Sequence, residues 1–287
     1  MTPLPRLVLP RALAALTVGV LAASLSAGTA TAAAPEASAA PAAKAANACK
    51  FRPGPGNTGA HGVRQDRGTT SLRSGQTLEN ANVSSLEIRG SGITVRNVRV
   101  SGNIFVTPGS SKVRIVRSTA QGIGISSASR ISVVRSDIGF SSDDAIHVTS
   151  DAGSLVRGVK LRYNYIHDPR VTNGAHYDGT QVRGVHGMLI ECSTYRAGPY
   201  QSNFNAGVYL ENANGGDSNV TVHHNWIFGY AFSVMVDAES ATFTANRVRD
   251  PHWRACYLGN SSGSGGFESS GNMALPSHRH VSLCGQG

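Results

Sequence analysis

Charged residues are scarce in this chain: Asp, Glu, Lys and Arg together make up 15% of its 287 residues. That scarcity excludes a coiled coil or a long charged helical array, which needs abundant Glu, Lys and Arg. With 40% hydrophobic residues, the chain is not a disordered polyelectrolyte either. After residue 49 the sequence is rich in Val, Ile, Ser, Thr, Asn and Gly, a mixture that favours short strands joined by tight turns.

No apolar run is long enough to cross a membrane, but the N-terminus has the pattern of a secretory signal peptide. Two separated arginines precede an apolar run from Ala12 to about Leu25, and an A-x-A-type cleavage site follows near Ala32–Ala34. We therefore predict a cleaved signal peptide rather than an uncleaved anchor, and a secreted, extracellular protein. The predicted parts are a signal peptide over residues 1–33, an Ala/Pro-rich linker over 34–48, and one domain over 49–287 with a C-terminal cap or tail.

No C-x-x-C pair occurs among the four cysteines, so neither a zinc ribbon nor a thioredoxin-type redox site is expected. In an exported chain the cysteines are expected to form disulfides, and three pairings are open. We favour Cys256–Cys284, which would pin the C-terminal tail against the domain. Cys49 can pair with Cys192 only if the N-terminal segment reaches the middle of the fold.

Short runs of alternating apolar residues recur along the chain at roughly the 20-to-50-residue spacing typical of a solenoid. In the first series each run is a tetrad whose second and fourth residues are apolar or small, as in a strand with one buried face. The first series comprises Asn103–Val106, Gly122–Ile125, Ala145–Val148, Gly179–Val182, Gly207–Leu210, Ser233–Val236 and Ala255–Leu258. The second series comprises Val113–Val116, Ile131–Val134, Val159–Arg162, Gly187–Ile190, Val220–His223 and Ala241–Thr244.

A polar column, mostly Asn, follows the second series. It comprises Asn97, Ser118, Ser136, Asn164, Cys192, Asn225, Asn246 and Asn272. Asn tolerates the left-handed turn conformation, and its side chain hydrogen-bonds backbone groups. One such residue per coil would satisfy the buried turn groups of a β-solenoid.

The repeats and the Asn column resemble the right-handed parallel β-helix proteins of the pectate-lyase-like superfamily, over roughly Thr69 to Met273. The resemblance implies an all-β fold, a right-handed parallel β-helix (solenoid) of about eight coils. An antiparallel sandwich is the alternative, but hairpin signals such as Asn-Gly between adjacent strands are scarce.

Two local motifs resemble those of known families. His176–Gln181, with the sequence HYDGTQ, resembles an H-x-D-G-x-Q motif found in a subset of secreted bacterial β-helix proteins. Ser142–Ile146, with the sequence SDDAI, resembles the paired-aspartate segment of polygalacturonase-type glycoside hydrolases, whose pair supplies acid catalysis. That family's Gly-His-Gly and Arg-Ile-Lys motifs are absent, which argues against hydrolysis of that kind. The calcium aspartates and dedicated arginine of pectate lyases do not carry over residue by residue.

The outward positions of the first series predict a functional face. In each tetrad the third residue and the residue just past the fourth point to solvent. Stacked coil upon coil, they form two columns: Phe105, Gly124, His147, Gln181, Tyr209, Met235 and Tyr257, and Thr107, Ser126, Thr149, Arg183, Glu211, Asp237 and Gly259. Asp144, His176 and Asp178 lie just ahead of the strands. Clustered titratable groups perturb one another's pKa values, so the middle of these columns is a candidate active site.

The charge balance predicts the partner. With 26 Lys and Arg against 17 Asp and Glu, the net charge of +9 suits an acidic polysaccharide that contains uronates. Nucleic acid is not expected, because the arginines are dispersed and no nucleic-acid-binding fold is recognised. We expect a monomer with no membrane partner.

The leading hypothesis is a polysaccharide lyase. β-Elimination at a uronate needs a base, a group that neutralises the carboxylate, and an acid for the leaving oxygen. We predict Arg183 as the carboxylate clamp, His147 or His176 as the base, and Tyr209 as the acid or a partner of the base. Gln181, Asn205 and Tyr257 are predicted to bind substrate. Asp144, Asp178 and Asp237 are candidate ligands for Ca²⁺, with Glu211 beside them; a uronate epimerase would use much the same groups.

Two other functions fit the same residues. A glycoside hydrolase needs two carboxyls, about 5–5.5 Å apart for retention or 6.5–9.5 Å for inversion, and Asp178 with either Asp144 or Glu211 could supply them. A non-catalytic carbohydrate-binding or surface protein would instead use Phe105, Tyr209 and Tyr257 as sugar platforms.

Overall fold

The computed structural model describes residues 49–62, 64–172, 174–249, 251–259 and 266–284, and shows a parallel β-helix built from three sheets. The predicted signal peptide and linker lie outside the described residues. Every strand pairing is parallel except that of the last two strands, β28 and β29. Among the described residues there is no helix that could cross a bilayer.

Each coil contributes one strand to each sheet, so consecutive strands of a sheet come from consecutive coils. Sheet A contains, in spatial order, β1 (Gln65–Asp66), β4 (Ala81–Val83), β7 (Arg99–Val100), β10 (Thr119–Ala120), β13 (Asp137–Gly139), β16 (Tyr165–His167), β19 (Thr194–Arg196), β22 (Trp226–Phe228), β25 (Arg247–Arg249), β28 (Met273–Ala274) and β29 (Arg279–His280). Sheet B contains β2 (Thr70–Leu72), β5 (Leu86–Ile88), β8 (Asn103–Val106), β11 (Gly122–Ser126), β14 (Ile146–Thr149), β17 (Thr180–Arg183), β20 (Ala206–Glu211), β23 (Phe232–Val236) and β26 (Arg254–Leu258). Sheet C contains β3 (Thr77–Glu79), β6 (Thr94–Arg96), β9 (Ser111–Val116), β12 (Ser129–Val134), β15 (Val156–Arg162), β18 (Val185–Glu191), β21 (Ser218–His223), β24 (Ala241–Thr244) and β27 (Phe267–Ser270).

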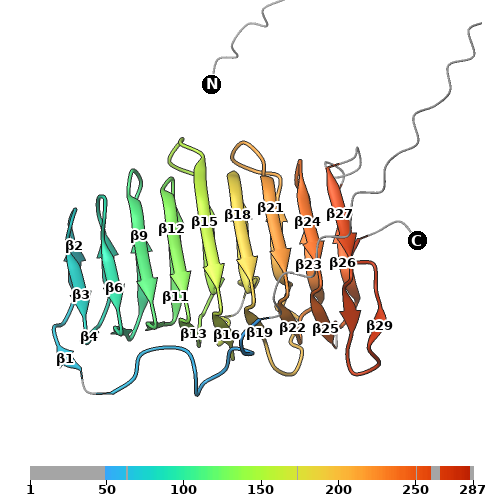
Figure 1. Ribbon diagram of the computed structural model, residues 1–287, viewed down its shortest axis with the longest axis horizontal. Coiled ribbons are helices and arrows are strands. Elements are labelled where there is room, and N and C mark those ends of the chain that lie inside the picture. Colours follow the sequence, from blue (N-terminus) through green and yellow to red (C-terminus); the bar gives the residue numbers. More distant parts are fainter. Residues whose placement is uncertain (1–48, 63, 173, 250, 260–265, 285–287) are drawn as a thin grey trace, which may run out of the picture. The chain divides into compact units, whose positions relative to one another are not determined.

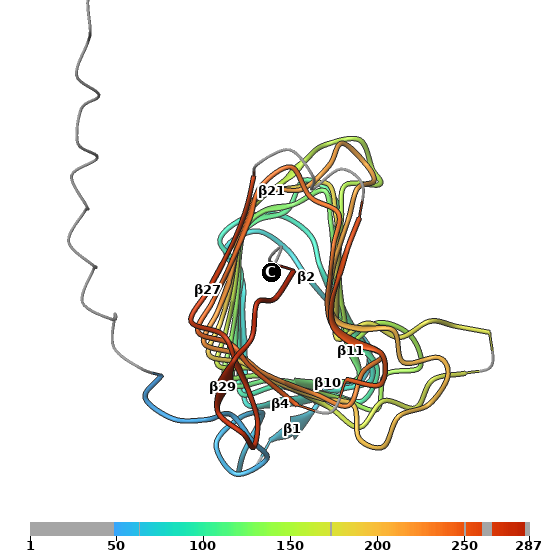
Figure 2. The same ribbon diagram turned by 90° about the vertical axis from the view of Figure 1, so that its right-hand side faces the viewer.

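The winding is right-handed. The strands of each sheet lie side by side along the long axis (Figure 1). Viewed from the C-terminal end, the chain passes from sheet A below to sheet B on the right and then to sheet C on the left (Figure 2), anticlockwise as it approaches the viewer. The predicted fold class is therefore confirmed, with nine strands in each of sheets B and C rather than about eight coils.

The predicted alternation places the apolar residues inside. In β8, Ile104 and Val106 are buried while Asn103 and Phe105 are exposed, and the other strands of sheet B repeat the pattern. The first predicted series corresponds to sheet B and the second to sheet C. The strands of sheet A escape prediction because most contain only two or three residues, too few to show a period.

The polar column forms a hydrogen-bonded ladder inside the turn between sheets C and A. The backbone N–H groups of Ser193, Asn225 and Asn246 donate to the Oδ1 atoms of Asn225 (2.9 Å), Asn246 (3.0 Å) and Asn272 (2.9 Å) in the next coil. Each of these asparagine side chains also donates to a backbone carbonyl, as Asn225 does to Ile190 (2.9 Å). The ladder thus satisfies turn groups that the core would otherwise leave unpaired.

Two members of the predicted column were wrong. Ser193 occupies the ladder position in place of Cys192, and Val98 occupies it in place of Asn97, with Val98 N–H donating to Ser118 Oγ (3.4 Å). Cys192 (φ 51°) and Asn97 (φ 54°) belong instead to the preceding turn position, where the backbone is left-handed. The left-handed residue and the ladder residue are therefore neighbours, not the same residue.

Removing one ladder side chain should be costly. Asn225→Ala deprives the Ser193 N–H and the Ile190 carbonyl of their partners in a fully buried turn. At about 1–3 kcal/mol for each orphaned group, we expect the free energy of unfolding to fall by about 2–5 kcal/mol, measured by urea titration. Asn103→Ala, at an exposed position of β8, is the control and should change it by less than about 0.5 kcal/mol. Equal stabilities of the two variants would contradict the ladder's role.

Two disulfides are formed, Cys49–Cys192 and Cys256–Cys284. The favoured pairing is confirmed, and the N-terminal segment does reach the middle of the fold. Residues 49–60, which we call the N-terminal strap, run along the outer side of sheet A (Figure 1), where Gly59 N–H donates to the Arg135 carbonyl (2.8 Å). Disulfides of this kind are typical of proteins that fold in an oxidising compartment.

Candidate functional site

The middle of the two predicted columns lies in register on the outer face of sheet B, whereas Thr107, Ser126 and Thr149 of the second column are buried rather than exposed to solvent. His147 in β14 pairs with Gln181 in β17, which pairs with Tyr209 in β20. In the second column Arg183 pairs with Glu211 in the next coil. The parallel pairing therefore brings these five side chains, from three consecutive coils, onto one surface.

Asp144 and Asp178 form a linked pair at the edge of this surface, just ahead of β14 and β17. The backbone N–H of Asp178 donates to Asp144 Oδ1 (2.8 Å). The Asp178 carboxylate accepts hydrogen bonds from Asn205 Nδ2 (3.0 Å) and from the backbone N–H of Ala206 (2.8 Å). Asp178 is only 1% exposed, so it sits beneath the surface and acts on its neighbours rather than on a bound molecule.

A buried aromatic corner lies under Asp178. The fully buried rings of Tyr177 and Tyr230 stack with centroids 5.9 Å apart. Gly179 is required here because a Cβ would lie 2.6 Å from the Gly207 carbonyl oxygen. Tyr177 of the HYDGTQ motif is therefore a core residue that packs under the site. The sequence did not predict this role.

Burial shifts the pKa values of both aspartates upward. Desolvation raises the pKa of Asp144 to about 7, and the nearby charges of Asp143 and Glu211 add to the rise. Desolvation and the Asp144 charge raise the pKa of Asp178 well above its usual range. Asp144 is therefore a carboxyl that carries a proton at mildly acidic pH.

Glu211 has two partners within the protein. Arg183 Nε lies 3.1 Å from Glu211 Oε2, and Gln181 Nε2 donates to the same oxygen (3.2 Å). The guanidinium that we predicted as a clamp for substrate thus has a carboxylate partner within the protein.

His147 and Tyr209 lie between these groups. Burial and the charge of Arg183 lower the pKa of His147, so its imidazole is neutral near pH 7. His147 Nδ1 lies 3.8 Å from Asp144 Oδ2, and its buried Nε2 has no hydrogen-bond partner within the described residues. Burial, followed by the charge of Glu211, raises the pKa of Tyr209 to about 12, so its phenol stays protonated.

The remaining predicted residues lie at the margin. His176 is exposed and lines, with Asn205 and Trp253, a pocket of about 140 Å³. Asp237 contributes to the raised pKa of Tyr209. Tyr257, 48% exposed, stands two coils beyond Tyr209 in the same column.

The predicted calcium ligands stay a prediction. Among the described residues no group of three or more His, Cys, Asp or Glu side chains could hold a metal ion. Asp144 Oδ1 and Asp178 Oδ1 already accept hydrogen bonds from protein N–H groups, and Asp178 is buried. We therefore derive no chemistry through calcium.

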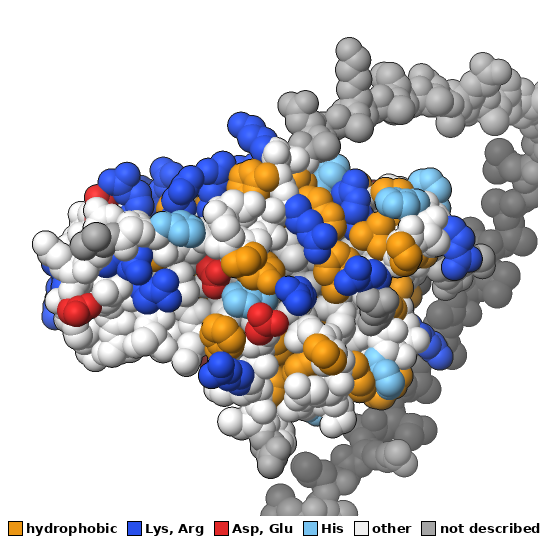
Figure 3. All heavy atoms as spheres, turned by 90° about the horizontal axis from the view of Figure 1, so that it is seen from below, with side chains coloured by type: hydrophobic (Ala, Val, Ile, Leu, Met, Phe, Trp, Pro, Cys, Tyr) orange, Lys and Arg blue, Asp and Glu red, His pale blue; other side chains and the backbone are white. Residues whose placement is uncertain are grey.

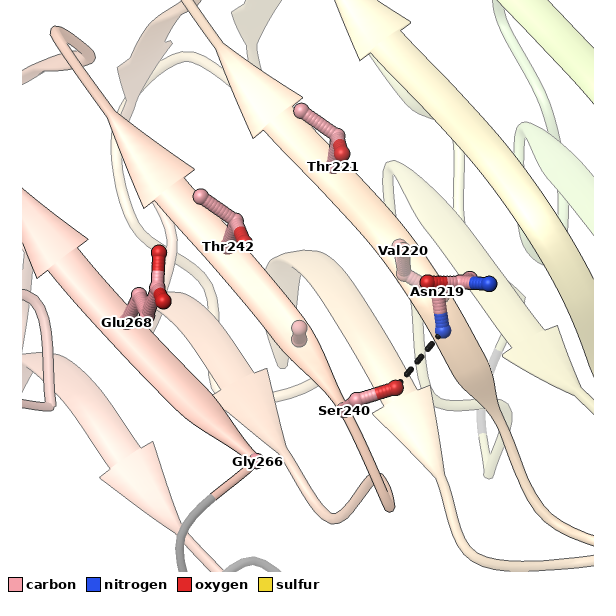
Figure 4. A pocket seen from close by; sticks show the side chains of 8 residues that line it. Asn219, Val220, Thr221, Ser240, Thr242, Gly266 and Glu268 are labelled. Carbon is pink, nitrogen blue, oxygen red and sulfur yellow. Dashed lines mark hydrogen bonds between the residues drawn. The ribbon is translucent and has the colours of Figure 1, made fainter.

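A different pocket lies on sheet C, between β21, β24 and β27 (Figure 4). Its polar side chains are mostly hydroxyls and an amide, with Ser240 Oγ accepting from Asn219 N–H (2.8 Å). Glu268 is its one carboxylate. Without a second titratable group it offers no acid–base pair, so the chemistry is assigned to sheet B.

Comparisons with known proteins add no family. No family model and no curated protein matches the chain. Among solved structures, a tailspike protein of Escherichia coli bacteriophage HK620 is similar with a TM-score of 0.36 and 13% identity, over 71% of this chain and 49% of that one. ORF18 of Geobacillus virus E2 is similar with a TM-score of 0.16 and 12% identity, over 73% of this chain and 52% of that one. The chain spans about half the length of both, and likenesses this weak carry no functional conclusion.

Proposed function

We propose that the protein is a glycoside hydrolase that acts on a polysaccharide, with Asp144 as general acid and Glu211 as the second carboxylate. The observation that carries the proposal is the contrast between two carboxyls on one face. Burial raises the pKa of Asp144 to about 7, while Glu211 is ion-paired with Arg183 at 3.1 Å. Acid-catalysed glycosidic cleavage requires one carboxyl that carries a proton and a second carboxyl on the same face.

In this mechanism Asp144 protonates the glycosidic oxygen as the bond to the leaving sugar breaks. Glu211 faces the developing positive charge of the sugar ring and either attacks the anomeric carbon or deprotonates a water that does so. Tyr209 and Gln181, on the same outward column, are placed to hydrogen-bond sugar hydroxyls. Asp178 is a positioning residue, because it fixes Asp144 through its backbone N–H.

The local charge favours hydrolysis over elimination. The charges of Asp143 and Glu211 both act on this site; Glu211 is paired with Arg183, which leaves Asp143 as the unmatched charge when Asp144 carries its proton. Such surroundings stabilise a cationic, oxocarbenium-like transition state, but they repel a uronate carboxylate at the cleavage point.

A polysaccharide lyase is the second candidate, and one observation favours it. The neutral imidazole of His147, with Nε2 unpartnered within the described residues, has the form of a general base. Tyr209, protonated to about pH 12, would then be the acid.

Product analysis tests the proposal. The secreted domain is incubated with a panel of neutral and acidic glycans, with and without chelator. We expect new reducing ends without the ultraviolet absorbance of an unsaturated sugar, and no effect of chelator. Unsaturated products would establish the lyase, loss of activity with chelator would restore the calcium hypothesis, and binding without cleavage would leave a carbohydrate-binding protein.

The pH profile distinguishes the two chemistries. Because Asp144 acts in its protonated form and its pKa is about 7, kcat/KM for hydrolysis should fall about tenfold per pH unit above pH 7. A His147 base would behave in the opposite way, since activity would rise through its lowered pKa and then stay level. Initial rates measured from about pH 5 to about pH 9 distinguish the two mechanisms. A level profile above pH 7 would exclude Asp144 as the acid.

A further inference from the structure

Two arginines lie over one phenylalanine on the outer face of sheet A, and a third stands beside it in the neighbouring strand. Arg196 in β19, Phe228 in β22 and Arg249 in β25 occupy the same outward position in consecutive strands. The guanidinium of Arg249 lies 4.9 Å from the Phe228 ring centroid, and that of Arg52, from the N-terminal strap, lies 4.7 Å from it. Figure 3 shows this face from below: Lys and Arg lie over both halves, those of the C-terminal half stand beside hydrophobic side chains, and the acidic side chains lie in the left half and the middle.

Arg196, Phe228 and Arg249 line a pocket of about 560 Å³, which we call the arginine pocket; Arg52 lies beside it, over the Phe228 ring. Arg196, Phe228 and Arg249 form one side. The stacked rings of Tyr200 and His252, 3.8 Å apart with an interplanar angle of 5°, form the other. The pocket therefore combines positive charge with flat apolar walls.

The two arginines that line the pocket, Arg196 and Arg249, are its positive charges, and Arg52 adds a third beside it. Within the described residues neither Arg52 nor Arg196 forms an ion pair with a carboxylate; Arg196 Nη1 donates to the Tyr165 hydroxyl at 3.5 Å. Burial, and then the charges of Arg249 and Arg196, lower the pKa of Arg52. An oxyanion bound between the guanidiniums would relieve this repulsion and match their planar donor geometry.

The arginine pocket adjoins the candidate site. Tyr200 also lines the neighbouring pocket of about 140 Å³ together with His176 and Asn205. Asn205 in turn donates to Asp178. A polymer that occupies the arginine pocket can therefore follow this wall toward Asp144.

We propose that the arginine pocket binds the oxyanion substituents, carboxylate or sulfate, of a polysaccharide. The pocket explains how a protein with acidic residues at its cleavage site selects an acidic polymer: the anionic sugars bind here, and the sugar at Asp144 is neutral. The statement that a neutral sugar lies at Asp144 rests on the proposed hydrolase, whereas the binding of anionic sugars in the arginine pocket does not. A saccharide is favoured over single-stranded nucleic acid because Phe228, 4% exposed under its guanidiniums, offers no ring face to a base, and the rings of Tyr200 and His252 already stack on each other.

Affinity electrophoresis of the secreted domain tests the proposal, with polygalacturonate, dextran sulfate or neutral dextran in the gel. The probes separate carboxylate from sulfate. We expect an acidic probe to retard the protein and neutral dextran to have no effect. The double variant R196Q/R249Q should bind the retarding probe at least about tenfold more weakly, since charge-assisted hydrogen bonds of this kind account for such a factor. Arg196→Lys, which keeps the charge but loses the fork, should give an intermediate loss.

A matched control separates the pocket from general electrostatics. R114Q/K160Q also removes two positive charges, but from exposed positions of sheet C, and should change the affinity for the probe by less than about twofold. Thermal unfolding of both double variants checks that they fold. The proposal would be overturned if the two double variants lost equal affinity for the acidic probe. It would also be overturned if R196Q/R249Q lost affinity for single-stranded DNA but not for either acidic glycan.

The binding assay is independent of catalysis. If R196Q/R249Q loses retardation while the parent protein releases no sugar from any glycan, the pocket stands and the hydrolase fails. If the parent protein cleaves a glycan and R196Q/R249Q binds the acidic probes as tightly as the parent protein does, the binding proposal is wrong and the hydrolase proposal stands.

Discussion

Asp144→Asn is expected to lower kcat/KM for glycan hydrolysis by about 10²–10⁴-fold, the contribution of a positioned general acid. Asn keeps the shape and can still accept the hydrogen bond from Asp178 N–H, but it has no proton to give to the leaving oxygen. Glu211→Gln should cause a loss of the same order, because it removes the charge that faces the sugar cation and breaks the ion pair with Arg183. Initial rates measured as reducing ends give both values.

The control for these variants is Glu268→Gln. Glu268 is an exposed carboxylate of β27 in the sheet C pocket, and its loss should leave kcat/KM within about twofold. Circular dichroism and the Tm should be unchanged in all three variants. Full activity in Asp144→Asn, or a large loss in Glu268→Gln, would move the reaction away from sheet B.

Removal of the Cys49–Cys192 disulfide is expected to be the largest single loss of stability. The bond closes a separation of 143 residues, and in the chain-entropy model a loop of that length contributes about 5 kcal/mol. The double variant C49S/C192S also frees the N-terminal strap, whose Phe51 ring lies 5.0 Å from that of Tyr163. Guanidinium unfolding at equilibrium measures the loss.

The second disulfide provides the comparison. Cys256–Cys284 closes only 28 residues, so C256S/C284S should lose about 3.5 kcal/mol in the same model. A larger loss from C256S/C284S than from C49S/C192S would show that the strap contributes little to the folded state. Binding to acidic probes should weaken only in C49S/C192S, because Arg52 belongs to the strap.

The repeats made most of the fold predictable. Tetrads such as Asn103–Val106 carry enough alternation to identify a strand, and they repeat often enough to identify sheets B and C. Sheet A carries no such signal, since β7 and β10 contain two residues each. The predicted Asn column marked where sheet A begins, although the left-handed position and the ladder position were merged.

The site was predictable only as far as strand register extends. Stacking the tetrads placed His147, Gln181 and Tyr209 together, because parallel pairing fixes which residues are neighbours. The burial of Asp178 and the pairing of Arg183 with Glu211 depend on loop conformation and side-chain rotamers, which no period encodes. The arginine pocket was missed because its residues come from sheet A and from the loops that follow its strands.

The position of the site within the stack has a consequence for heat inactivation. Strands β14, β17 and β20 occupy the interior of sheet B, with coils on both sides. In a linear array each coil is stabilised mainly by contacts with its two neighbours. Local unfolding therefore begins at the two terminal coils and proceeds inward. During slow warming, the backbone amide protons of β2 and β26 should therefore exchange with solvent well before catalytic turnover declines.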